Sequence, residues 1–330
     1  MSREGKTCLP RRSMRPARPH RLRRGGGGLK RKTVLCLLAA LGLAALLADA
    51  EGVRRGVAEA LALCGGTVIP SQFLFLAASS LLVSLGVGEV LAPRLEFLMW
   101  PLFRVDGAGA AALILGLVGG YPIGARTAAE LYREGSVTKG EADRLLTFCN
   151  TANPAFLISV LGAGVFGSVR VGMWLWLVHV LSALLTGILF RGGSGGRTEP
   201  RRPVPVRTVP PVQAFVDAVR GALDSVLRIC AFVTVFYVLA RPLRGLSGLG
   251  GAAAVGALEL FSAVPLLTDG PGGYVLAAAL AGWGGVSVLF QTLAVLADSG
   301  LSARACVLGK AVQAAISAAL ALATAGYVMG

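Results

Sequence analysis

Long apolar runs separated by short polar segments dominate this chain of 330 residues. Several runs are about 18 to 25 residues long, which is the length that an α-helix needs to cross the hydrocarbon core of a bilayer. In the first part of the chain they cover residues 33–50, 72–90, 145–166 and 171–190. The pattern predicts an all-α, polytopic integral membrane protein with about eight to ten membrane segments, the first of them an uncleaved helix.

Two polar segments lie between these runs. Residues 53–68 place charged side chains on a moderately apolar background, which predicts an interfacial amphipathic helix that ends at Pro70. Residues 130–144 predict a hydrophilic helix with a start signal at Thr138. We expect a solvated face of that helix to be formed by Glu141, Asp143 and Arg144.

Composition agrees with a membrane protein. Hydrophobic residues make up 55% of the chain and charged residues 15%, and the mean hydropathy is +0.70. These values exclude an ordinary soluble globular protein. The six cysteines are isolated from one another, without CxxC spacing, so neither a disulfide framework nor a metal site is indicated.

Positive charge is concentrated at the N-terminus, where residues 1–32 contain twelve Lys or Arg and one Glu. Nucleic-acid binding is one interpretation of this arm. The other, which we favour, is a disordered cytoplasmic arm that the positive-inside rule holds beside the membrane and that anionic lipids attract. A basic linker rich in Gly and Pro, residues 191–211, then separates a first membrane half, 33–190, from a second, 212–330.

The polar, glycine-rich stretch Gly119–Asn153 interrupts the apolar pattern of the first half. Its Gly-Gly-Tyr-Pro turn is incompatible with a regular transmembrane helix, because Pro122 removes a backbone donor and clashes with the preceding turn. Irregular backbone occurs at membrane depth where protein or a water-filled cavity supplies its hydrogen bonds. The stretch therefore predicts the lining of a site. The candidate substrate-binding residues of both halves are Gly119, Gly120, Tyr121, Pro122, Gly124, Arg126, Asn150, Asn153, Ser287 and Gln291.

Two features of the stretch favour an anionic ligand. The turn leads into a helix at residues 125–134, whose first N–H groups and positive dipole end would face the turn. Arg126 lies in the first turn of this helix, and its guanidinium can bind a carboxylate in bidentate fashion. Its alternatives are snorkelling to the interface and an ion pair with Glu130.

Other candidate residues also have two interpretations. Asn150 and Asn153 are either ligands or partners for the backbone where the helix breaks, and Tyr121 is either an aromatic wall or an interfacial anchor. Glu259, an ionisable group inside an apolar run, is the candidate for proton coupling. His179 is expected to be structural rather than a proton relay.

The second half repeats features of the first about 163 to 165 residues later. Leu258–Gly270 shares its L-E, Pro-Leu and Asp-Gly positions with Leu95–Gly107, and Gly284-Gly285 corresponds to Gly119-Gly120. Duplicated halves with glycine-broken segments are typical of secondary transporters, which bind substrate between the repeats. A duplicated helical scaffold without cargo is the alternative. Both basic segments should be cytoplasmic while five spans precede the linker, so either one segment is re-entrant or the interfacial helix crosses the membrane. The segment beginning at Ala108 is the best candidate for re-entry, which would make the repeats inverted.

Specific motifs resemble a known family. Residues 116–168 contain a GYPxGA(K/R) turn, a TxxEAxRLL helix and an N-x-x-N-P segment, and residues 282–296 read GWGGVSVLFQTLAVL. These motifs resemble the YlbJ (SpoVV) family of sporulation integral membrane proteins, within the wider nucleoside recognition or Gate-domain group. The resemblance extends from about Val53 to the C-terminus. It departs from the family at residues 259–263, where ELFSA replaces an E-x-T-N-G element, and in the arginine-rich arm.

The resemblance implies a protein of the mother cell of endospore-forming bacteria that lies in the outer forespore membrane. It also implies a transporter of a small organic anion, with dipicolinate as the first candidate. A non-transporting scaffold for spore-envelope assembly and a nucleoside-type carrier are the alternatives. The chain has no HExxH, P-loop or GxSxG motif, so we expect neither an enzyme nor a cofactor. Expected partners are the anion and anionic lipids but no nucleic acid, with a homo-oligomer or sporulation membrane partners also open.

Overall fold

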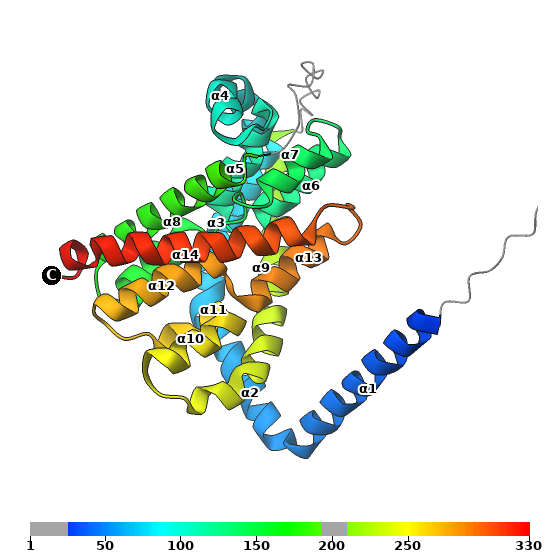
Figure 1. Cartoon of the computed structure of the whole chain (residues 1–330), viewed down its shortest axis with the longest axis vertical. Coiled ribbons are helices and arrows are strands. Elements are labelled where there is room, and N and C mark those ends of the chain that lie inside the picture. The colour runs from blue at the N-terminus through cyan, green and yellow to red at the C-terminus, as the bar shows by residue number, and fades with distance from the viewer. Residues whose placement is uncertain (1–25, 193–209) are drawn as a thin grey trace, which may run out of the picture. The chain divides into compact units, whose positions relative to one another are not determined.

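The computed structural model describes residues 26–192 and 210–330, and those residues form helices and connecting segments without any strand (Figure 1). The all-α class is therefore confirmed. The chain forms two compact units, Met1–Ala50 and Glu51–Gly330. Most of the predicted basic arm and linker lies outside the described residues, so their disorder stays a prediction.

The first unit contains helix α1, Gly26–Ala48, which begins before the predicted start at Thr33. The other elements, in chain order, are α2 (Ala50–Leu63), a π-helical turn (Cys64–Val68), α3 (Ile69–Ser84), α4 (Val87–Phe103), a 3-10 turn (Gly107–Gly109), α5 (Ala110–Gly119), α6 (Ile123–Arg133), α7 (Lys139–Leu145), a π-helix (Phe156–Val165), α8 (Val169–Leu189), α9 (Pro211–Ala240), a 3-10 turn (Arg241–Gly245), α10 (Gly248–Leu258), α11 (Leu260–Ala263), a 3-10 turn (Val264–Leu266), α12 (Pro271–Trp283), α13 (Gly285–Leu296) and α14 (Ala303–Val328).

Several helices meet the length and hydropathy that a membrane crossing requires. Within the described ranges these are five, Ala50–Leu82, Val169–Leu189, Pro211–Gly245, Pro271–Leu296 and Ala303–Val328. Shorter apolar helices are Lys32–Ala48, Phe156–Val165 and Gly248–Leu258. The polytopic membrane class is confirmed, whereas the exact number of crossings stays a prediction.

A sharp bend separates α4 from α5. The helices Pro93–Phe103 and Gly107–Gly119 are apolar enough to span a membrane only as a pair, and their axes meet at 96°. Asp106 caps the turn between them by accepting a hydrogen bond from the Ala108 N–H at 3.0 Å. A bend of this size occurs in a broken span and in a re-entrant loop, so re-entry after Ala108 and the inverted repeat stay predictions.

The prediction of a separate interfacial helix that ends at Pro70 is wrong. The helix continues from Ala50 to Leu82, because a π-helical turn at Cys64–Val68 precedes Pro70 and accommodates its missing N–H group. The Ser71 hydroxyl also donates to the Thr67 carbonyl oxygen at 2.6 Å. The charged residues predicted to mark an interfacial helix therefore belong to the first part of a long apolar helix.

The predicted span at residues 145–166 is also wrong. Residues 150–153 are irregular, and the helix that follows is a π-helix of only ten residues, Phe156–Val165. Pro154 disfavours a helical conformation at the preceding residue. The irregular backbone finds partners elsewhere, since the Ala152 N–H donates to His179 Nε2 at 2.9 Å.

The predicted helix at residues 130–144 is two helices, α6 and α7, because Gly135 between them has a positive φ of 76°. The start signal at Thr138 is confirmed, since Thr138 and Glu141 form a reciprocal capping box. The prediction that this helix has a solvated face is wrong for its two acidic residues. Glu141 is buried and accepts from the Asp106 N–H at 3.1 Å, and Asp143 accepts from the Ser302 N–H at 2.7 Å.

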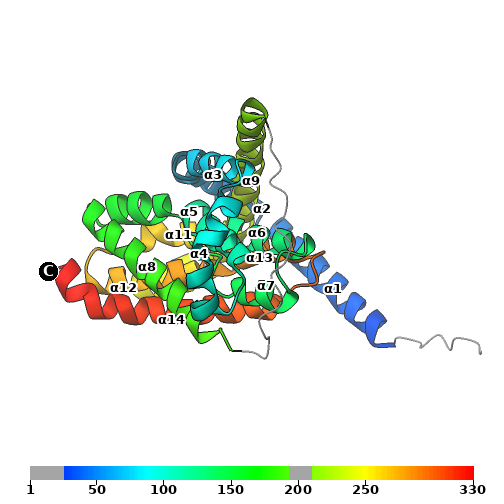
Figure 2. The same cartoon turned by 90° about the horizontal axis from the view of Figure 1, so that it is seen from above.

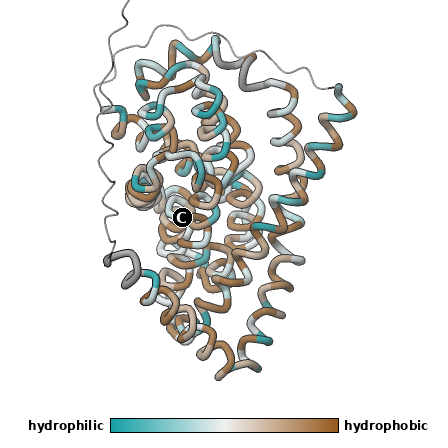
Figure 3. The backbone as a smooth tube through the Cα atoms, turned by 90° about the vertical axis from the view of Figure 1, so that its right-hand side faces the viewer, coloured by the Kyte–Doolittle hydropathy of each residue, from teal (hydrophilic) through white to brown (hydrophobic). Residues whose placement is uncertain are grey.

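The helices pack in two groups within Glu51–Gly330. Helix α14 lies against α12 and α8, and α3 lies against α9 (Figures 1 and 2). Hydrophobic residues cover most of the longer helices, while hydrophilic residues gather towards the end where α6 and α7 lie (Figure 3). Unusually close packing joins α5, α6 and the irregular segment, because Gly116 and Gly124 both lie against the Cys149 carbonyl oxygen.

Replacing Gly124 with Ala should destabilise the protein. A Cβ at this position would lie 1.9 Å from the Cys149 carbonyl oxygen, so the backbone must shift. We expect a loss of about 1–3 kcal/mol or more, measured as a lower thermal unfolding temperature in detergent. Gly140→Ala, at an exposed position of α7, is the matched control and should not lower that temperature. Equal unfolding temperatures for the two variants would contradict this packing.

Candidate functional site

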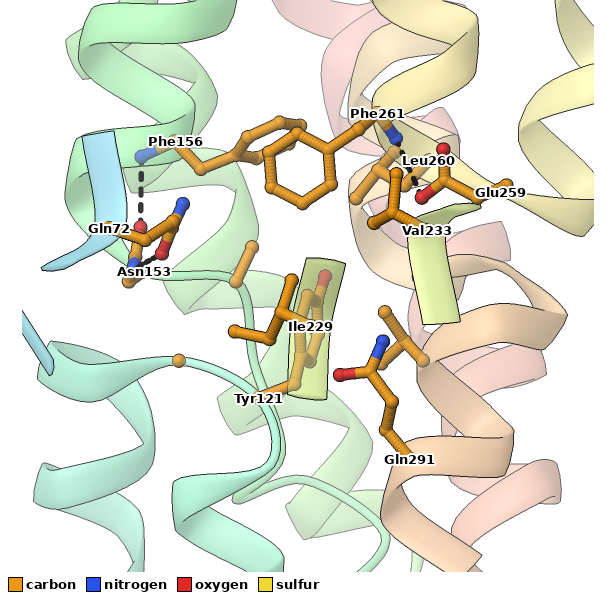
Figure 4. A pocket seen from close by; sticks show the side chains of 13 residues that line it. Gln72, Tyr121, Asn153, Phe156, Ile229, Val233, Glu259, Leu260, Phe261 and Gln291 are labelled. Carbon is orange, nitrogen blue, oxygen red and sulfur yellow. Dashed lines mark hydrogen bonds between the residues drawn. The ribbon is translucent and has the colours of Figure 1, made fainter. Parts of the chain in front are cut away.

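A pocket with an empty volume of about 420 Å³ lies between the two membrane halves (Figure 4). From the first half it is lined by Gln72, Gly120, Tyr121, Ala152, Asn153 and Phe156, and from the second by Ile229, Val233, Glu259, Leu260, Phe261, Val288 and Gln291. The candidate residues that the structure brings to this pocket are therefore Gly120, Tyr121, Asn153, Glu259 and Gln291.

The turn after α5 forms one wall of the pocket. Gly120 has a positive φ of 80°, and a Cβ there would lie 3.0 Å from both Cβ and N of Asn153, so the turn requires glycine. Tyr121 follows, and its hydroxyl donates to the Ala281 carbonyl oxygen of α12 at 2.7 Å. This hydrogen bond fixes the aromatic wall across the boundary between the halves.

Amide side chains lie on two sides of the pocket. The Asn153 amide donates to Gln72 Oε1, and Asn153 Oδ1 accepts from the Phe156 N–H at 2.9 Å (Figure 4). Gln291, on α13, points its amide toward Tyr121 and Ile229 (Figure 4). Since an amide both donates and accepts, these groups can bind carboxylates as well as neutral polar ligands.

Glu259 is the acidic residue of the pocket lining. Its side chain is 1% exposed and caps α11. The carboxylate accepts hydrogen bonds from the Phe261 N–H at 3.1 Å and from both the N–H and the hydroxyl of Ser262. Local donors therefore satisfy this buried group, while its role in coupling stays a prediction.

Two phenylalanine rings close the pocket opposite Tyr121. Phe156 comes from the first half and Phe261 from the second, and their ring centroids lie 4.9 Å apart in an edge-to-face arrangement (Figure 4). Together with Tyr121 they give the pocket aromatic surfaces that suit a flat ligand.

Arg126 does not reach the pocket. Its side chain is 61% exposed, and Nε pairs with Glu130 Oε1 at 3.0 Å. The structure thus shows the ion pair that the sequence offered as an alternative to ligand binding. The other candidates that do not line the pocket are Gly119, Pro122, Gly124, Asn150 and Ser287.

These remaining candidates have packing roles near the pocket. Gly124 allows the close approach to the Cys149 carbonyl oxygen, and Gly119 packs against Ser79. Asn150 Nδ2 donates to Thr292 Oγ1 of α13 at 2.9 Å, which joins the halves. Ser287 is fully buried, and its hydroxyl lies 3.4 Å from Gln291 Nε2.

Sequence reasoning missed Lys310, which is 1% exposed in the middle of α14. Its ammonium donates to the Asn150 carbonyl oxygen and to Gln313 Oε1, each at 3.0 Å. The nitrogen also lies 4.9 Å from the centroid of the Tyr121 ring. The signal was available, because a lysine inside a long apolar run is a functional candidate by default.

Sequence reasoning also missed Gln72 and the aromatic pair. Gln72 is a single amide inside the apolar helix α3, which is the same kind of signal as Lys310. Phe156 and Phe261 gave no signal, because phenylalanine in an apolar segment is ordinary. Only the fold brings these two rings together.

Comparison with known proteins gives two matches. Residues 66–169 match the Gate family, which is described as nucleoside recognition. Over 273 residues the chain is 30% identical to the sporulation integral membrane protein YlbJ of Bacillus subtilis (strain 168), and the alignment covers 73% of this chain and 66% of that protein. The chain thus spans just under two thirds of this relative's length. No solved structure matches the chain.

The Gate match covers only part of the pocket. It includes all six first-half lining residues, Gln72 to Phe156, and ends at Val169, the first residue of α8. The pocket residues from the second half, and Lys310 on α14, lie outside this match.

Replacing Glu259 with Ala should destabilise the protein, because it leaves the Ser262 hydroxyl and two backbone N–H groups without their acceptor. We expect a loss of about 1–3 kcal/mol, seen as a lower thermal unfolding temperature in detergent. Glu259→Gln keeps one acceptor oxygen and should lose less. Glu134→Ala, at an exposed position after α6, should change stability by no more than about 0.5 kcal/mol. A Glu259→Ala variant as stable as this control would disprove the capping role.

Proposed function

Because the chain belongs to the YlbJ family of sporulation integral membrane proteins, we propose that it is a membrane carrier that acts during sporulation. Its proposed cargo is a small organic anion, with dipicolinate as the first candidate. Its proposed location is the outer forespore membrane of the mother cell. Anionic lipids at the N-terminal arm, a homo-oligomer and other sporulation membrane proteins remain predicted partners.

One observation carries the proposal. The pocket lies between the halves, at two places where helices break at glycines with positive φ, Gly120 at 80° and Gly284 at 84°. Secondary transporters bind their substrates at such breaks, since the freed backbone and its neighbours can contact the ligand. A scaffold without cargo would not require a pocket lined by amide, carboxyl and aromatic side chains at this boundary.

The chemistry of the pocket is compatible with dipicolinate, a planar pyridine with two carboxylates. Tyr121, Phe156 and Phe261 supply surfaces for a flat ring. The amides of Gln72 and Gln291 lie on different walls and supply N–H donors for carboxylate oxygens.

A nucleoside-type carrier is the second candidate, and one feature of the pocket favours it. Among the described residues that line the pocket there is no Lys or Arg, whereas amides, aromatic rings and one carboxyl group are present. Such a lining also suits a neutral planar base with polar edges. The match to a family described as nucleoside recognition supports the same alternative.

Uptake into proteoliposomes should separate these functions. With purified full-length protein, we expect saturable uptake of labelled dipicolinate above that of empty vesicles, under imposed proton or sodium gradients. Excess unlabelled uridine should compete weakly. Strong uridine uptake without dipicolinate uptake would establish the second candidate, and no uptake of either solute in any gradient would favour the scaffold.

Substitutions inside and outside the pocket should show whether the transported anion binds there. Gln291→Ala removes an amide from the pocket wall, and we expect uptake at low dipicolinate concentration to fall about tenfold, which corresponds to the loss of about one hydrogen bond to a charged group. Arg126→Ala is the matched control, because Arg126 lies outside the pocket, and it should change uptake less than about twofold. The reverse pattern would place the anion site at Arg126.

A further inference from the structure

Among the described residues that line the pocket, one is acidic and none is basic, although positive charge nearby would stabilise a buried organic anion. Lys310 is a buried cation close to this lining, with Nζ 4.9 Å from the centroid of the Tyr121 ring. Tyr121 lines the pocket, so a single aromatic ring connects the lysine to the ligand space. This placement gives Lys310 an electrostatic role without direct contact with the ligand.

Lys310 is held rigidly at this position. Its two hydrogen-bond acceptors come from both halves, the Asn150 carbonyl oxygen of the irregular segment and Gln313 one turn along α14. The neighbouring Gly309 packs directly on Thr147, since a Cβ there would lie 2.3 Å from the Thr147 carbonyl oxygen. Glycine at 309 therefore brings α14 close enough for the lysine to reach Asn150.

The ammonium has no anionic partner in the described part of the chain. The side chains around it are the Tyr121 ring, the His179 imidazole of α8 and the thiols of Cys149 and Cys306. The described helices α12 and α13 contain no charged residue. A buried cation without a counter-ion is costly at membrane depth, and an anion in the adjacent pocket would lower that cost.

Other polar groups beside Lys310 are also incompletely paired. Asn150 Oδ1, Gln313 Nε2 and His179 Nδ1 are buried without a hydrogen-bond partner. His179 Nε2 accepts from the Ala152 N–H, so a neutral imidazole carries its proton on Nδ1 and has an unused donor. The cluster thus contains three polar atoms without hydrogen-bond partners beside a cation without a counter-ion. In a purely structural network every such group would be paired.

We propose that Lys310 is the residue that makes the pocket selective for anions over neutral molecules of the same shape. The ammonium, 4.9 Å from the centroid of the Tyr121 ring that lines the pocket, supplies the positive charge that the pocket lining lacks. This inference rests on the proposed carrier function. It also assigns a function to a residue outside the region that matches the Gate family.

The test compares two ligands of the same shape and different charge. Dipicolinate and its neutral diamide, pyridine-2,6-dicarboxamide, are titrated into the purified full-length protein, and the ratio of their dissociation constants is measured. In the wild-type protein we expect dipicolinate to bind at least tenfold more tightly than the diamide. Lys310→Gln should weaken dipicolinate binding about tenfold or more and diamide binding less than about twofold. Lys310→Arg, which keeps the charge, should retain most of the preference.

Matched controls separate a charge effect from a loss of structure. Lys139→Met removes an exposed lysine from α7 and should leave both affinities unchanged. If Lys310→Gln weakens the binding of both ligands equally, or of neither ligand, the proposed role of Lys310 in selectivity is wrong. A loss of preference in Lys310→Arg equal to that in Lys310→Gln would contradict the charge argument. If the wild-type protein binds neither ligand, the proposed carrier function itself fails.

Discussion

The structure depends on satisfying backbone polar groups where helices break inside an apolar protein. At membrane depth an unpaired N–H or C=O group has no water to bind, so each break needs partners from other helices. Side-chain hydrogen bonds join the irregular residues 150–153 to the rest of the protein, two of them made by the distant side chains Lys310 and His179. Lys310 donates to the Asn150 carbonyl oxygen, Thr151 donates to the Gly116 carbonyl oxygen, and His179 accepts from the Ala152 N–H. These hydrogen bonds keep residues 150–153 in an irregular conformation beside the Gly120 turn, where Asn153 lines the pocket.

Much of the fold was predictable from the sequence, because the length of an apolar run and the cost of polar backbone in lipid act locally. The same reasoning identified the Gly120 turn, Asn153, Glu259 and Gln291, all of which line the pocket. It was wrong at Pro70, because a π-helical turn can absorb a proline, and nothing in the local pattern indicates that turn. It also selected Arg126 over Lys310.

The choice between these two cations shows what local patterns omit. Arg126 lies beside the glycine-rich turn in sequence, but the helix turns its side chain outward to Glu130. Lys310 is distant in sequence and reaches the same region only because α14 packs on the irregular segment. Proximity in the chain therefore identified a turn that lines the pocket, together with a cation that lies outside it.

The close contact of Gly116 and Gly124 with the Cys149 carbonyl oxygen limits how this protein can evolve. Neither position accepts a side chain, so changes in ligand preference cannot arise at this part of the fold. The pocket is also lined by the apolar side chains of Ile229, Val233 and Val288. Their positions carry side chains and do not depend on the close backbone contacts that Gly116 and Gly124 make. Divergence toward a new cargo is therefore expected on the wall built by α9 and α13, rather than at Gly116 and Gly124, which lie outside the pocket lining.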